Sequence, residues 1–162
     1  MLCLLWYNPQ NGLTMYQVKV KYDKMQENGC IKPTVDVYVV DALSFTEAEA
    51  RATEYAQPFI SGEFTITDLK RVKYAEVWGN EAGDMWYEAQ LEFITLDEKT
   101  GCEKRTKNRM LVQASNLTEA MQAVADNMRG TMADYEAVCV KETPILDYIK
   151  CESTQPQNTQ EK

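Results

Sequence analysis

The chain has 162 residues, 44% of them hydrophobic, and a formal net charge of −8. This length suits one domain, or two halves of about 70 residues that share a core, because each half alone would bury too little surface. The negative charge disfavours general binding to duplex DNA, since neutralisation of phosphates by Lys and Arg supplies most non-specific affinity.

Residues 1–14 form an N-terminal extension that begins with a short apolar run and breaks at an Asn-Pro pair. The run lacks the positive region and the length of a secretory signal. It is also far shorter than the roughly 20 apolar residues that a membrane span requires. Because Met15 stands just before the first predicted strand, we interpret Met15 as a candidate native start.

Residues 15–78 show the pattern of a ββαβ unit. Polar and apolar residues alternate over 16–22, as in a half-buried strand, and Asn28-Gly29 supplies a hairpin turn before a second strand over 34–41. Ser44 with Glu47 forms a capping box that begins a helix, and Pro58 ends it. A long strand or a bent pair of strands follows over residues 64–77.

The same plan recurs over residues 84–150, after a linker at 79–83. Asn116 and Glu119 repeat the capping box of Ser44 and Glu47 at an offset of 72. We therefore predict an α+β fold of two tandem ββαβ repeats, forming a pseudo-twofold two-layer sandwich with the helices on one face of a largely antiparallel sheet. Residues 151–162 contain almost no residue to bury, so we expect a disordered tail.

The residue types argue against an enzyme. The sequence has no histidine, the usual general base at neutral pH, and it lacks nucleotide-binding and nucleophile-elbow motifs. Capping of the helices explains the repeated glutamates Glu47 and Glu119. Five scattered cysteines without a Cys-x-x-Cys pair indicate reduced thiols in a cytoplasmic setting. We expect no cofactor and no metal.

Several stretches resemble a family of small proteins from Bacteroidetes bacteria and their phages or mobile elements, a family catalogued only as a domain of unknown function. They are residues 16–22, 38–50, 59–66, 86–87, 110–116 and 144–147. The resemblance implies a phage or mobile-element origin and a cytoplasmic location. It brings no known catalytic residues.

The strand face opposite the predicted helices carries the first candidate site. Val35, Val37 and Val39 point there if Val40 faces the helix, and an apolar patch on an open sheet face often marks an interface. Trp78 and Trp86 flank the linker, where they either seal the junction of the repeats or anchor a partner. We predict a protein that binds a protein partner, or itself, through this face.

The alternative is binding of single-stranded nucleic acid. The basic residues for it are Lys19, Lys21, Lys24, Lys70, Arg71 and Lys73, with Tyr38 or Tyr74 as a stacking surface. Lysines on a solvated strand face that deters aggregation give the same pattern. A third reading is sequestration of a small nucleotide between the repeats, and no particular residue selects it.

Overall fold

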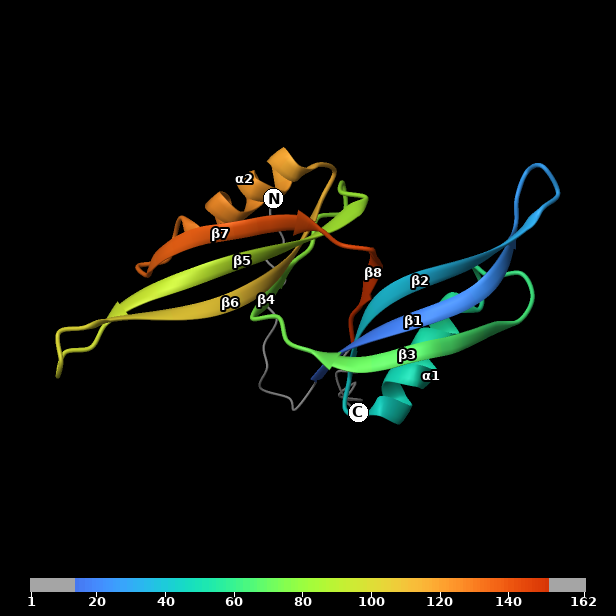
Figure 1. Cartoon of the computed structure of the whole chain (residues 1–162), viewed down its shortest axis with the longest axis horizontal. Helices are drawn as coiled ribbons and strands as arrows, with labels where there is room; N and C mark the ends of the chain where they lie inside the picture. Colours follow the sequence, from blue (N-terminus) through green and yellow to red (C-terminus); the bar gives the residue numbers. More distant parts are fainter. Residues whose placement is uncertain (1–13, 152–162) are drawn as a thin grey trace, which may run out of the picture.

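The computed structural model describes residues 14–151 as an α+β protein with two helices and two mostly antiparallel sheets of four strands (Figure 1). Its elements are β1 (Thr14–Met25), β2 (Ile31–Ala42), α1 (Phe45–Ala56), β3 (Phe64–Val72), β4 (Glu76–Trp78), β5 (Met85–Leu96), β6 (Glu103–Ala114), α2 (Leu117–Met128), β7 (Asp134–Glu142) and β8 (Ile145–Ile149). The predicted N-terminal extension at residues 1–14 falls almost entirely outside this range, as does the predicted disordered tail.

The strands form two sheets rather than the single sheet predicted. The first sheet has the order β3-β1-β2-β8, and the second has the order β4-β6-β5-β7. Helix α1 covers one face of the first sheet and α2 covers one face of the second, on opposite sides of the molecule in Figure 1. The α+β class and the largely antiparallel pairing are confirmed. Neither helix within residues 14–151 is long and apolar enough to cross a membrane.

Two short strands connect the sheets. The predicted long strand over 64–77 divides, so that β3 pairs with β1 whereas β4 joins the second sheet parallel to β6. Strand β8, which the sequence did not indicate, returns to the first sheet and lies parallel to Val37–Val40 of β2. Each sheet therefore contains one strand that comes from the other half of the chain.

Both helices begin at the predicted caps. The backbone N–H of Glu47 donates to Ser44 Oγ at 3.2 Å, and that of Glu119 donates to Asn116 Oδ1 at 2.9 Å. Each glutamate carboxylate accepts in turn from the backbone N–H of the residue before the cap, at 3.1 and 2.9 Å. These bonds satisfy backbone donors that a helix start leaves unpaired, so capping explains both acids.

Four apolar clusters hold the described residues 14–151 together. Two lie between α1 and the first sheet, and another lies between α2 and the second sheet. The fourth, which we call the central cluster, joins the two sheets where β4 and β8 cross between them. Its buried members are Met15, Val37, Val39, Tyr74, Val77, Trp86, Leu111 and Ile145.

Candidate protein-binding surface

The structure corrects the predicted open face at two of its three valines. Val37 is 5% exposed and Val39 is 0% exposed, because both lie in the central cluster, whereas Val35 is 50% exposed. The second sheet covers the inner part of this face through the crossing strands. Only the outer part of the face, beyond Val37, is available to a partner.

The two tryptophans are not exposed anchors either. Trp86 is buried in the central cluster, where its ring meets that of Tyr148 edge-on at 6.2 Å between centroids. Trp78 packs partly buried against the core beneath α2, and its Nε1 donates to Glu76 Oε2 at 2.8 Å. Both rings therefore support packing within the chain, the first of the two roles considered from the sequence.

The register of the first sheet places lysines beside aliphatic residues on the outer part of the open face. Lys21 stands opposite Val35, and Met25 stands opposite Ile31, at the end of the β1–β2 hairpin. Alternation puts all four on the face away from α1. Lys19 and, on β3, Lys70 share that face. We call this set the lysine–valine face: Lys19, Lys21, Lys70, Met25, Ile31 and Val35.

The aliphatic members of this face are strongly exposed. Met25 is 71% exposed and Ile31 is 66% exposed, and Val35 lies between them and the central cluster. On β2, Val35 and Ile31 thus continue the buried Val37 and Val39 outward along the same face of the strand. We call Ile31 and Val35, together with Met25 opposite Ile31, the aliphatic lane. An exposed apolar patch of this kind on an open sheet face is a candidate interface.

Three of the six predicted basic residues lie elsewhere. The guanidinium of Arg71 lies on the helix side, 5.3 Å from the centroid of the Phe45 ring. Lys24 alternates to the same side as Tyr22, and Lys73 follows the end of β3. The structure therefore brings together Lys19, Lys21 and Lys70 but not the complete stripe predicted from the sequence.

Two carboxylates, Asp23 and Asp68, share the face with these three lysines. Lys19 Nζ lies 3.6 Å from Asp68 Oδ2, whereas neither Lys21 nor Lys70 forms an ion pair within residues 14–151. A lone exposed pair such as Lys19–Asp68 contributes little to stability. Positive charge on this face is therefore available to an incoming group.

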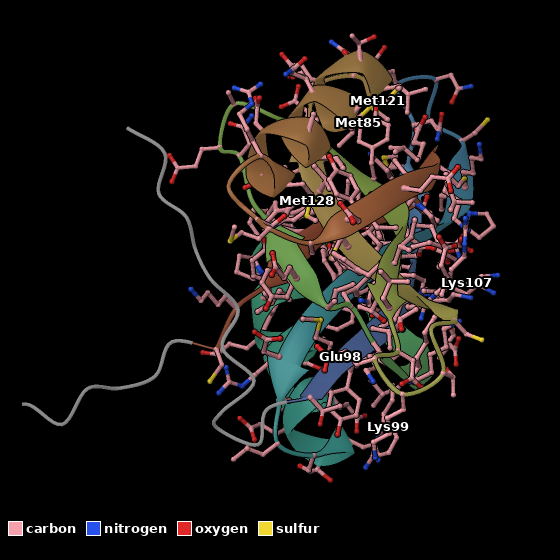
Figure 2. The ribbon with its side chains drawn as sticks, turned by 90° about the vertical axis from the view of Figure 1, so that its left-hand side faces the viewer. Met85, Glu98, Lys99, Lys107, Met121 and Met128 are labelled. Atoms are coloured by element: carbon pink, nitrogen blue, oxygen red, sulfur yellow. The ribbon has the colours of Figure 1, made fainter. Side chains whose placement is uncertain are left out.

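The matching face of the second sheet is neutralised by its own charges. Arg105 lies 3.3 Å from Glu92 and 3.1 Å from Glu136, and Lys107 lies 3.8 Å from Glu92. Glu88 lies 3.9 Å from Arg109 and 3.5 Å from Lys141. Figure 2 views the molecule from the end of the β5–β6 hairpin and labels Lys107 of β6, together with Glu98 and Lys99 on the loop between β5 and β6. The two faces differ in composition and in how their charges are satisfied.

Neither tyrosine considered for base stacking is accessible. Tyr38 is buried beneath α1, and burial followed by the charge of Asp36 raises the pKa of its hydroxyl. Tyr74 belongs to the central cluster, where its hydroxyl donates to Glu88 Oε2 at 3.4 Å and the guanidinium of Arg109 lies 5.5 Å from the ring centroid. A base could reach these rings only after the core opened.

Sequence reasoning missed a buried polar contact that holds β8. Asp41 is buried on β2 and accepts a hydrogen bond from the Tyr148 hydroxyl. Burial raises the pKa of the Asp41 carboxyl, an effect that the hydrogen bond from Tyr148 partly offsets. At the corresponding position of β6, the Gln113 amide holds the linker by bonds to Asn80 N and Gly83 O, each of 3.0 Å. Asp41 therefore helps to hold β8 in place, and Gln113 helps to hold the linker between the two halves.

The cysteines and carboxylates of the described region do not gather into a metal site. Among residues 14–151, no group of three or more Cys, Asp or Glu side chains is placed to hold a metal ion. Cys151 contacts Arg51, whose Nη2 lies 3.1 Å from Sγ, while Cys30, Cys102 and Cys139 are exposed and free.

The geometry defines a small α+β protein of two joined four-stranded sheets, each covered by one helix, with one uncovered face of mixed lysine and aliphatic character. The chain belongs to the family described as a domain of unknown function (DUF4494), whose model matches residues 14–151. This match confirms the resemblance to an uncharacterised family. No curated protein matches the chain.

Proposed function

We propose that this protein is a non-catalytic accessory protein of a phage or mobile element that acts in the cytoplasm by binding another protein through the lysine–valine face. The observation that carries the proposal is the contrast between the two sheets. Acids and bases satisfy one another on the second sheet, whereas Lys21, Lys70 and the aliphatic lane of the first sheet have no such partners within residues 14–151.

The energetics favour an interface of this composition. Burial of an exposed aliphatic side chain contributes about 1.5–3 kcal/mol at most, so three half-exposed or more exposed residues supply a useful apolar centre. The surrounding lysines add specificity and faster association with a partner of opposite charge. Most of the apolar residues at the junction of the sheets, by contrast, are already buried.

We further propose that residues 15–78 and 84–150 are tandem copies related by a pseudo-twofold axis. Read from the opposite edge, the second sheet is β7-β5-β6-β4, which matches β3-β1-β2-β8 strand for strand. The crossing strands β4 and β8 occupy equivalent edge positions in this comparison. Exchange of one strand between copies is the arrangement that a swapped dimer has, here within one chain.

Binding of single-stranded nucleic acid is the second candidate, and the free lysines support it. Lys19, Lys21 and Lys70 would contact phosphates, but the other members of the lysine–valine face are aliphatic and offer no aromatic ring for stacking. Sequestration of a small nucleotide between the halves has less support, since the central cluster fills their junction with buried side chains.

Site-specific photo-crosslinking in native cells tests the proposal. A photoreactive amino acid at Val35 should join the chain to one protein, and the same group at Lys99, on the distant β5–β6 loop, should not. Charge reversal by Lys21→Glu with Lys70→Glu should lower the Val35 adduct at least tenfold. The proposal fails if Val35 yields no adduct or if Lys99 gives the same one. Fluorescence anisotropy with single-stranded DNA and RNA at low salt tests the second candidate.

A further inference from the structure

We infer that the lysine–valine face receives an acidic amphipathic helix, which packs its apolar side on β2 and directs its carboxylates to the lysines of β1. This inference rests on the proposed function and adds the chemistry of the partner. It follows from three features: the charge of the face, the blocked edge of β2, and the dimensions of the lane.

Charge complementarity selects an acidic partner. The face carries three lysines, Lys19, Lys21 and Lys70, against two carboxylates, Asp23 and Asp68, and only Lys19 forms an ion pair with one of them. The protein as a whole has a net charge of −8, so this local positive patch contrasts with the rest of the surface. A basic partner would meet unpaired lysines at short range, which costs binding energy. An acidic partner converts them into ion pairs beside an apolar centre.

The edge of β2 does not suit an added strand. Strand β8 pairs only with Val37–Val40, so the outer part of this edge lies free. The bond from Gln26 N to Cys30 O, together with the register, directs the backbone groups of even-numbered β2 residues toward β1. The backbone N–H and C=O groups of the odd-numbered residues therefore point to the free edge. Pro33 is one of these residues, and it has no N–H to donate. A continuous ladder cannot extend along this edge.

The dimensions of the face fit a helix instead. The lane from Ile31 to Val35 covers five residues of β2, or roughly 16 Å at about 3.3 Å per residue. This length corresponds to about three turns of a helix. A helix about 10 Å wide spans two strands that lie about 4.8 Å apart, so it would cover the aliphatic lane of β2 and the lysines of β1 together. Helix α1 packs on the opposite face of the same sheet.

Selection from a display library of random 20-residue peptides tests this inference on the full chain. The wild type should enrich acidic peptides whose apolar residues recur three and four positions apart. Val35→Asp should weaken the selected peptides at least tenfold, and Lys21→Glu with Lys70→Glu should shift the selection toward basic residues. Lys99→Glu, away from the face, should leave both affinity and selection unchanged.

Several results would overturn the inference. The inference fails if no peptide is enriched, if the enriched peptides are basic or neutral, or if their apolar residues alternate with period two. It also fails if acidic peptides bind Val35→Asp as well as they bind the wild type, or if the face binds labelled single-stranded DNA in preference through the same lysines. If photo-crosslinking at Val35 still captures a protein, the proposed function stands and only the partner chemistry is wrong. If that crosslink is absent, the proposed function itself fails.

Discussion

Substitution of Val39 by alanine should destabilise the protein far more than the same substitution at Val35. The two valines lie on the same face of β2, yet Val39 is 0% exposed and Val35 is 50% exposed. Val39→Ala removes two methyl groups from the central cluster, at about 0.8 kcal/mol each, and leaves a cavity. We expect a total loss of about 2–3 kcal/mol. Val35→Ala should cost less than about 0.5 kcal/mol.

Urea denaturation followed by tryptophan fluorescence measures this difference. Trp86 belongs to the same central cluster as Val39, so its emission reports on unfolding of the junction between the sheets. With a urea dependence of about 2 kcal/mol per molar, Val39→Ala should move the midpoint down by about 1 M, and Val35→Ala should leave it in place. The urea dependence of the unfolding free energy should be the same for the wild type, Val39→Ala and Val35→Ala, because the surface exposed on unfolding hardly changes.

Two results would refute this reasoning. If Val39→Ala and Val35→Ala have equal midpoints, the second sheet does not cover the inner part of the face. If Val35→Ala is the more destabilised variant, Val35 contributes to the fold rather than to an interface. If Val35→Ala is as stable as the wild type, any loss of affinity of that variant for the selected peptides reports on binding alone.

Two further substitutions test the segments that join the halves. A Cβ at Gly83 would lie 2.7 Å from backbone atoms of Ala114, so Gly83→Ala should lower the free energy of unfolding by about 1–3 kcal/mol, as measured by thermal melts. The control is Gly79→Ala, which should be as stable as the wild type because the nearest atom to its Cβ lies 3.7 Å away. Burial raises the folded-state pKa of Asp41 above its ordinary 3.8, so its ionised form opposes folding at neutral pH, and this penalty disappears as pH falls through the folded pKa toward 3.8. Asp41→Asn, which keeps an acceptor for Tyr148, should therefore raise Tm at pH 7, and this gain in Tm should shrink toward pH 4. An equal gain in Tm at pH 7 and pH 4 would contradict a raised pKa of Asp41 in the folded state.

Local patterns in the sequence were sufficient to predict the helices and most strands. The alternation over residues 16–22 has one buried side, as the burial of Tyr16, Val18 and Val20 confirms. The spacing of Ser44 and Glu47 located the start of α1, because capping is a contact between residues three apart. Such features depend on neighbours in the chain, and a single sequence contains them.

The pairing of the crossing strands could not be predicted in this way. Strand β4 has three residues and β8 has five, too few for a periodic pattern, and each pairs with a strand distant in the sequence. The apolar run Val35, Val37 and Val39 did indicate that this face needed a cover. It gave no information on whether the cover was the second half of the chain or another molecule. In the structure the second half of the chain covers Val37 and Val39, whereas Val35 is half exposed.

The difference between the two sheets therefore bears more on function than their likeness does. At the position of β6 that matches Val35, the second sheet has Lys107, and Glu92 stands where the first sheet has Lys21. In the second sheet these two residues face each other and pair at 3.8 Å, so each charge has a counterion within the sheet. In the first sheet a lysine stands opposite a valine, and neither residue satisfies the other. Such a pair does little for the stability of the fold, whereas it suits a partner that brings both a carboxylate and an apolar side chain.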